Sequence, residues 1–296
     1  MASHSGSGTD MRETTASLTR FGISTATLTG SLAEKLRAAR DAGFTAVSLA
    51  ARDLVAHPDG VDAAAALIGA SGLRIAAFQS LRDFEGLPTH LRDYKLEVTK
   101  SLLDLMDRVD ARLLLVSSSM SPNAVGDIQR IADDLCLLGT LATPRGIRIA
   151  YEPLVWARFV NDYDTAWRAV TLAGRENVGL AVDSFHVLAR STAPAFFDAI
   201  PGERIFIVQL SDYLWDLDDI VETARHHRVF PSEGNHGAII AQLIQGVVRA
   251  GYAGDFTFDV TNDDYSHLPA AAVAARARNA ALWAIDSMRE AGTSAG

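Results

Sequence analysis

The feature that most restricts the fold of this chain is a regular alternation of short apolar runs with amphipathic segments of helix length, which begins at Phe21. Such an alternation predicts repeated βα units. Because each run is apolar throughout, and not only at every second residue, the runs indicate a parallel sheet that is covered on both faces. We predict strands at residues 21–27, 44–50, 73–78, 111–118, 146–152, 177–183, 204–210 and 254–260.

The number of these units favours a closed barrel. Eight βα units in 296 residues fit an α/β fold of the (β/α)₈ TIM barrel type, which typically takes about 250 residues. An open doubly wound sheet is the alternative, but its G-x-G-x-x-G signature follows none of the runs. We therefore predict one TIM barrel domain over residues 19–292, after a disordered lead-in over residues 1–18. Ser31 and Glu34 predict a capping box at the start of the first helix.

Composition narrows the classes of function. The net charge of −9 and the absence of a Lys/Arg block argue against nucleic-acid binding. No apolar run approaches the roughly 20 residues that span a bilayer, and no secretory signal is recognised, so we expect no membrane association. Cys136 is the single cysteine and permits no internal disulfide, which suits a reducing compartment, the cytoplasm by default. A homo-oligomer is compatible with the sequence, which does not fix the oligomeric state.

Four consecutive predicted strands end in a side chain with an oxygen donor. In a TIM barrel the C-terminal ends of the strands meet at one mouth, where active sites lie. Carboxylates and an amide are ligands that Mg²⁺ or Mn²⁺ prefers, and converging carboxylates would repel one another without a cation. A single acid at a strand end is more often a helix N-cap or an ion-pair partner. Four in succession favour a divalent metal site formed by Glu152, Asp183, Gln209 and Asp259.

Three other side chains are placed to act on a bound substrate. His186 follows Asp183 by three residues, and a histidine near such a site is the commonest general base. The alternative for His186 is a buried, hydrogen-bonded side chain in the first turn of a helix. Arg82 and Arg228 follow the third and seventh strands, and an arginine fork suits a carboxylate substrate, although loop arginines are usually solvated.

Beyond these residues, much of the sequence resembles a known family. It is similar to the metal-dependent 3-dehydroshikimate dehydratases, which belong with the sugar phosphate isomerases and epimerases to the xylose isomerase-like TIM barrels. The similarity extends over nearly the whole chain after residue 20 and is most specific in the YEP, DSFH and VQL motifs. It rests on the segments ISTATLTGSLAEKL (23–36), FQSLRDFEG (78–86), YEPLVWARFVNDY (151–163), VGLAVDSFHVLAR (178–190), VQLSDY (208–213), RHHRVFPSEG (225–234) and GYAGDFTFDVTND (251–263).

This resemblance implies an enzyme, a hydro-lyase that dehydrates 3-dehydroshikimate to protocatechuate in quinate and shikimate catabolism. It implies a divalent cation, Mg²⁺, Mn²⁺ or Co²⁺, and a small carboxylate as the substrate. The residues implied are the metal ligands Glu152, Asp183, Gln209 and Asp259, the catalytic residues His186 and Glu152, and the carboxylate-binding arginines Arg82 and Arg228.

Three departures from the family leave the exact substrate open. Asp259 stands where the family usually has glutamate, Ala51-Arg52 replaces an E-N pair, and Ala224 replaces a serine. An isomerase or epimerase of a sugar phosphate or keto-sugar on the same metal-dependent barrel is one alternative. A barrel that binds a small molecule without catalysis is another. The two arginines favour a carboxylate over a neutral sugar.

Overall fold

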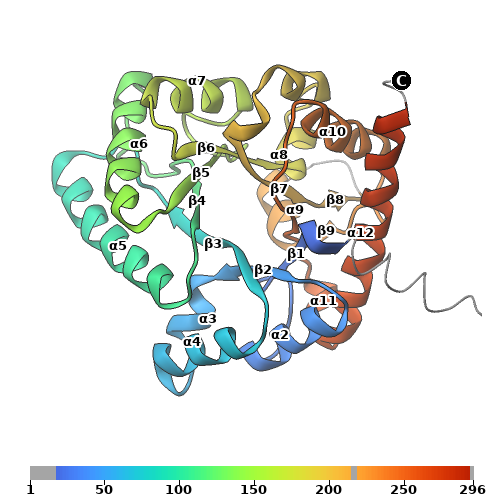
Figure 1. Ribbon diagram of the computed structural model, residues 1–296. Coiled ribbons are helices and arrows are strands. Elements are labelled where there is room, and N and C mark those ends of the chain that lie inside the picture. The colour runs from blue at the N-terminus through green and yellow to red at the C-terminus, as the bar shows by residue number, and fades with distance from the viewer. Residues whose placement is uncertain (1–17, 215–218, 294–296) are drawn as a thin grey trace, which may run out of the picture.

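The computed structural model describes residues 18–214 and 219–293. In this part of the chain, eight parallel strands close into a barrel, and helices surround it (Figure 1). The predicted (β/α)₈ barrel is therefore confirmed. In their order around the barrel the strands are β1 (Phe21–Ser24), β10 (Phe256–Phe258), β7 (Ile205–Leu210), β6 (Val178–Asp183), β5 (Arg148–Glu152), β4 (Leu113–Ser117), β3 (Arg74–Arg82) and β2 (Ala46–Ala50).

Each strand overlaps its predicted run, but the ends differ. β1 stops at Ser24 because a turn begins there: the Ser24 carbonyl accepts from the Thr27 N–H at 3.1 Å, and its hydroxyl accepts from the Ala26 N–H at 3.1 Å. β3 is longer than its run, and its last residue, Arg82, pairs with Ser117 of β4. The sequence predicted that Arg82 lies on the loop after this strand. In the structure it is the last residue of the strand itself.

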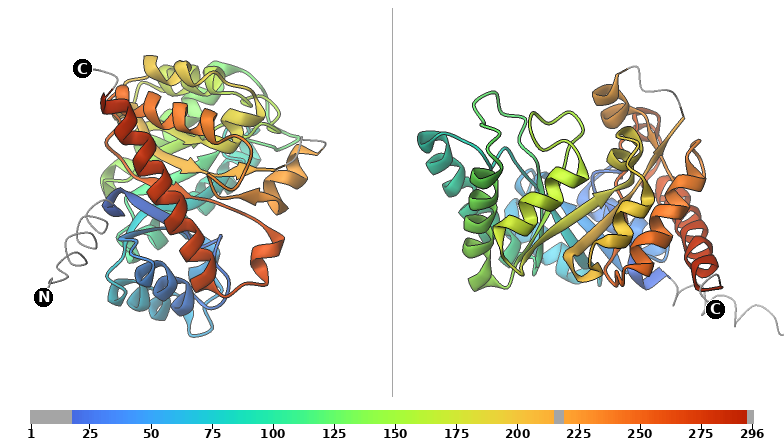
Figure 2. Two further views of the ribbon diagram at one scale, coloured as in Figure 1. Left: turned by 90° about the vertical axis from the view of Figure 1, so that its right-hand side faces the viewer. Right: turned by 90° about the horizontal axis from the view of Figure 1, so that it is seen from above.

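The helices form the outer layer, which two further views show (Figure 2). The capping box at the start of α2 is confirmed, because the Ser31 side chain accepts from the Glu34 N–H and the Glu34 side chain accepts from the Ser31 N–H. The α-helices are α2 (Leu32–Asp41), α3 (Ala51–Val55), α4 (Gly60–Ala70), α5 (Thr89–Arg108), α6 (Ile128–Ala142), α7 (Tyr163–Ala173), α8 (Ser184–Ala189), α9 (Ile220–His226), α10 (Gly237–Arg249), α11 (Asp263–Ser266) and α12 (Ala270–Thr293). Short 3-10 helices occur at Leu18–Arg20, Thr143–Arg145, Pro194–Ala199 and Gly202–Arg204.

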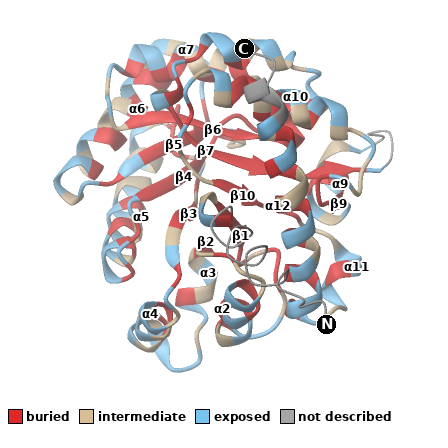
Figure 3. Ribbon diagram, turned by 45° about the vertical axis from the view of Figure 1, so that its right-hand side comes forward, coloured by how far each residue is buried: buried red, intermediate tan, exposed pale blue. Residues whose placement is uncertain are grey.

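The strands are buried on both faces, as their continuous apolar runs predict (Figure 3). Every residue of β2, β4, β6 and β7 is buried. Most of the core lies between the strands and the helices. A smaller cluster consists of strand residues alone and fits the barrel interior: Ala77, Leu113, Leu115, Ala150, Ala181, Phe206 and Ile207.

Two short strands outside the barrel are absent from the sequence prediction. β8 (Asp212–Tyr213) pairs antiparallel with β9 (Arg228–Val229), and Tyr213 is the register partner of Arg228. The chain between them includes α9. This pairing brings Arg228 back beside β7, so Arg228 lies in a strand and not in a loop.

Residues 1–17 of the predicted lead-in lie outside the described residues. Leu18, the last residue of that segment, is buried and begins the first 3-10 helix. Among the described helices, none combines the length and the hydrophobicity needed to cross a lipid bilayer.

Candidate functional site

A cavity of about 500 Å³ opens at the C-terminal ends of the strands. Both arginines that the sequence singled out, Arg82 and Arg228, line it. Gln209 lies at the end of β7 with 1% of its surface exposed. The cavity is also lined by four of the other predicted site residues, Glu152, Asp183, His186 and Asp259.

Two buried acids meet at the ends of β5 and β6. Ligand atoms of Glu152, Asp183 and His186 all lie within 4.8 Å of one another. The Ser117 hydroxyl donates to Glu152 Oε2 at 3.0 Å. Burial is the largest of the effects that together raise the pKa of Glu152 to about 8; the negative charge of Asp183 acts in the same direction, and Arg228 acts against both. Two ionised carboxylates at this place therefore need positive charge beyond that of Arg228.

The Asp183 carboxylate is both a helix N-cap and an ion-pair partner. Its Oδ1 caps α8 by accepting from the Phe185 N–H at 2.8 Å. Its Oδ2 accepts from Arg228 Nη1 at 2.7 Å, and both side chains of this ion pair are at most 7% exposed. The Tyr163 hydroxyl accepts from the Asp183 N–H at 2.7 Å. The carboxylate is thus fixed in position, with its Oδ2 toward the cavity and His186.

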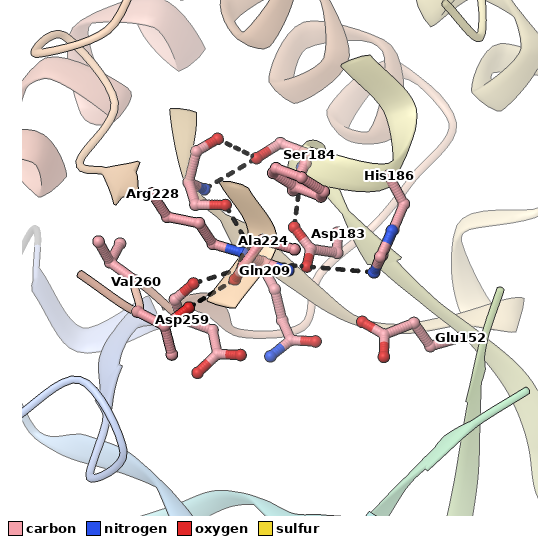
Figure 4. Close-up of polar contacts among 12 residues, drawn as sticks. Glu152, Asp183, Ser184, His186, Gln209, Ala224, Arg228, Asp259 and Val260 are labelled. Carbon is pink, nitrogen blue, oxygen red and sulfur yellow. Dashed lines mark hydrogen bonds and ion pairs between the residues drawn. The ribbon is translucent and has the colours of Figure 1, made fainter. Parts of the chain in front are cut away.

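Gln209 and Asp259 are two further oxygen donors near Asp183, and Asp259 lies across from Glu152 (Figure 4). Gln209 Nε2 donates to Gln79 Oε1 at 3.5 Å, whereas Gln209 Oε1 is buried without a hydrogen-bond partner among the described residues. A buried carbonyl oxygen without a partner is costly, and a cation would satisfy it. Asp259 Oδ1 accepts from Gln79 Nε2 at 3.4 Å, and Asp259 does not belong to the compact group of Glu152, Asp183 and His186.

His186 sits in the first turn of α8, between two aromatic rings. The ring centroids of Trp156 and Phe185 lie 5.1 and 5.5 Å from that of His186. Nδ1 accepts from the Val155 N–H at 3.4 Å, so the neutral ring carries its proton on Nε2, which lies 3.9 Å from Asp183 Oδ2. Burial lowers the pKa of His186 well below 6.5, and the charge of Arg228 lowers it further. The imidazole is therefore neutral at neutral pH.

The two predicted arginines differ in their contacts. Arg228 is buried and its guanidinium lies 4.4 Å from the Phe185 ring centroid. Its Nε donates to the Ala224 carbonyl at 2.9 Å and its Nη1 to Asp183, so within the described chain only Nη2 remains for a substrate. Arg82 is exposed, and its Nε donates to Ser80 Oγ at 3.3 Å. Arg228 thus holds Asp183 in place, a contact that the sequence did not reveal.

Sequence reasoning missed several polar residues of the site. Ser117 ends β4 and bonds to Glu152, and Gln79 links Gln209 to Asp259. Both stand in or beside strand ends, in LLLVSS and FQSLRDFEG, so the same strand-end signal could have found them. Trp156, which contacts the His186 ring, lies on the loop after β5 and carries no such signal.

Glu85 is a further buried acid near the mouth, on the loop after β3. Its Oε1 accepts from the Ser119 N–H at 2.6 Å and from the Tyr151 hydroxyl at 2.9 Å. Its Oε2 has no hydrogen-bond partner among the described residues. Burial raises the pKa of Glu85 from 4.5 to about 7. Between pH 4.5 and about 7, Glu85 is therefore mostly protonated in the folded protein and mostly ionised in the unfolded chain.

Glu85→Gln should change how stability depends on pH. Because the pKa is raised in the folded state, the stability contributed by protonated Glu85 is complete below pH 4.5 and is lost as pH rises through about 7. Glutamine resembles the protonated acid, so relative to the parent the variant should gain up to about 3 kcal/mol between pH 5 and pH 8. Urea unfolding at both pH values measures this gain. The exposed Glu176 provides the control, Glu176→Gln, and an equal response in both variants contradicts the prediction.

Comparison with known proteins places this barrel in a family. Residues 36–290 match the model that describes the xylose isomerase-like TIM barrel. The chain belongs to this family. The match extends from α2 almost to the end of α12, so it includes every strand of this xylose isomerase-like barrel except β1.

Within this family, the sequence of the chain is similar to those of two Pseudomonas proteins. It is 37% identical over 268 residues to the 3-dehydroshikimate dehydratase of Pseudomonas aeruginosa, a match that covers 90% of this chain and 42% of that protein. The enzyme of the same name from Pseudomonas putida is 36% identical over 247 residues, with coverage of 83% and 39%. The chain therefore spans about two fifths of the length of these curated relatives.

A solved structure also matches this xylose isomerase-like barrel over most of its length. A xylose isomerase-like TIM barrel/4-hydroxyphenylpyruvate dioxygenase fusion protein superposes with a TM-score of 0.88 and 34% identity. The superposition covers 92% of this chain and 44% of the fusion protein. The resemblance drawn from the sequence is confirmed.

Proposed function

We propose that the chain is a divalent-metal-dependent 3-dehydroshikimate dehydratase, a hydro-lyase that forms protocatechuate and water. The observation that carries the proposal is that Glu152, Asp183 and Asp259, strand-end donors within the dehydratase-like segments, line one cavity together with His186. The identity of 37% to the Pseudomonas aeruginosa dehydratase over 90% of the chain supports the choice of substrate.

A divalent cation, Mg²⁺, Mn²⁺ or Co²⁺, would be held by Glu152, Asp183, Gln209 and Asp259. The residues fit such an ion, because Gln209 Oε1 has no hydrogen-bond partner in the described part of the chain and Glu152 cannot readily ionise beside Asp183 without added positive charge. When bound, the cation supplies a Lewis acid that withdraws electrons from the ketone of the substrate. Asp259 is one methylene shorter than glutamate, so it would need a closer strand or a bridging water to act as a ligand.

His186 would move the proton of the reaction at Nε2. It would take the proton from the carbon beside the ketone and return it to the ring hydroxyl that leaves as water. The proton then moves from one atom of the substrate to another, and the reaction releases none. Because Nδ1 accepts from the Val155 N–H, the base form requires the other tautomer, with the proton on Nδ1. Substrate binding must therefore release the long contact to Val155.

The arginines would orient the carboxylate of the substrate. Arg82 is exposed at the mouth and can offer both Nη groups while its Nε stays with Ser80, whereas Arg228 can offer Nη2 while its Nη1 stays with Asp183. A carboxylate at the mouth leaves the opposite part of the ring, with its ketone, near the acids. The cavity volume of about 500 Å³ is ample for a six-membered ring acid.

Metal removal tests the proposal. We expect exhaustive chelation to abolish the formation of protocatechuate from 3-dehydroshikimate, followed by ultraviolet absorbance, and added Mn²⁺ or Mg²⁺ to restore it. Activity that persists in protein shown to be free of metal contradicts the metal site. Metal-loaded protein that is inactive on 3-dehydroshikimate but converts an uncharged keto-sugar is an isomerase or epimerase.

A further inference from the structure

Two exposed arginines lie at or just after the ends of neighbouring strands, at the mouth of the cavity. Arg52 is the second residue of α3, directly after the end of β2, and Arg82 is the last residue of β3. Both line the cavity. β2 and β3 are paired, and Ala50 lies opposite Gln79 in their register. Arg52 and Arg82 are therefore attached to the same sector of the rim, which we call the β2–β3 sector.

The acids that follow these arginines in the sequence, Asp53 and Asp83, bind other groups and do not pair with the arginines. Asp53 accepts from Lys35 Nζ at 2.8 Å, in an ion pair whose side chains are about one tenth exposed. Asp83 Oδ1 accepts from the Met120 N–H at 2.7 Å. In the part of the chain that the structure describes, neither arginine forms an ion pair. Their positive charge is thus available to a ligand.

Below the rim, the cavity is less suited to an anion. Glu152, Asp183 and Asp259 line its inner part, and the buried Arg228 is held against Asp183. An incoming carboxylate would be repelled by these acids unless a cation neutralised them. The β2–β3 sector of the rim offers two guanidinium groups that have no ion-pair partner among the described residues, whereas the α9 part of the rim offers one, that of Arg225.

We infer that Arg52 and Arg82 together bind the carboxylate of the substrate on the β2–β3 side of the mouth. Two planar guanidinium groups can engage both carboxylate oxygens, which fixes the plane as well as the position of the group. Arg52 is then a specificity-determining residue for a small carboxylate. The identity of that carboxylate, 3-dehydroshikimate, rests on the proposed function.

Arg52→Gln in the metal-loaded protein tests the inference. We expect KM for 3-dehydroshikimate to rise about 10- to 100-fold, because a charged hydrogen bond is lost. kcat should change little, because Arg52 would contact the carboxylate and not the reacting carbon, and would bind ground and transition states alike. Arg52→Lys keeps the charge but not the fork and should recover part of the loss. Arg225→Gln removes the same charge from another part of the rim, on α9, and serves as the matched control.

A binding measurement separates this inference from the proposed function. Calorimetry compares shikimate with its uncharged methyl ester, neither of which needs to react. The parent should prefer shikimate, and Arg52→Gln should lose most of that preference, even if 3-dehydroshikimate proves not to be the substrate. Unchanged KM and unchanged preference in Arg52→Gln overturn the inference while leaving the dehydratase intact. An equal effect of Arg225→Gln also overturns it, because the attraction would then be a general charge effect.

Discussion

Replacement of His186 by alanine should lower the turnover of 3-dehydroshikimate by about 10²–10⁴-fold, the usual contribution of a proton-transferring side chain. The metal content should stay close to that of the parent. The imidazole is neutral, faces the cavity with Nε2, and lies 3.9 Å from Asp183 Oδ2. Kinetics with metal analysis of the same protein preparation measure both quantities.

The alternative role for His186 is that of a metal ligand. Its ring nitrogen lies in one compact group with Glu152 and Asp183, so a cation could be bound by these three instead of by the four strand-end donors. Loss of metal together with activity in His186→Ala would show that the histidine is a ligand. The matched variant is Gln209→Leu, which should lose metal if the unpaired Gln209 Oε1 binds it. Thermal unfolding of both variants identifies any general loss of structure.

Arg228→Ala should destabilise the fold by about 3–5 kcal/mol, because it leaves Asp183 buried without its partner. The loss should be larger in metal-free protein, where no cation compensates Asp183 and Glu152. The catalytic efficiency should fall with it, since Asp183 would no longer be held in position. Arg228→Lys retains the charge but not the contacts that Nε and Nη1 make, so it should recover only part of both quantities.

Arg82→Ala provides the comparison for Arg228. Arg82 is exposed and forms no ion pair within the described residues, so its loss should raise KM without lowering the free energy of unfolding. Urea unfolding and steady-state kinetics on both alanine variants distinguish the two roles. If Arg228→Ala raises KM but leaves the free energy of unfolding unchanged, Arg228 is a substrate ligand first and its ion pair with Asp183 is of minor weight.

The strands were predictable because each is buried on both faces, and such burial leaves a continuous apolar run in the sequence. The convergence of Glu152 and Asp183 followed from topology alone, since all strand ends of a parallel barrel meet at one mouth. The capping box at Ser31 was equally local, because it depends on two residues three positions apart. These features need no knowledge of contacts between distant segments.

What the sequence left open depends on such distant contacts. The ion pair of Arg228 with Asp183 joins residues 45 positions apart, and it exists because β9 pairs with β8. Two-residue strands are too short to leave a hydrophobic pattern. The tautomer of His186 depends on a backbone N–H of Val155, 31 positions away. The exact ends of β1 and β3 likewise depend on the turn at Ser24 and on pairing with β4.

The double use of the Asp183 carboxylate bears on how this barrel can change during evolution. One side chain begins a helix, anchors a buried arginine and faces the cavity, so a mutation there disturbs several requirements together and is hard to rescue with one further mutation. Arg52 and Arg82 touch little of the scaffold. Changes in substrate preference can therefore accumulate at the rim while the interior stays constant, and directed evolution toward a new acid should begin with those two positions.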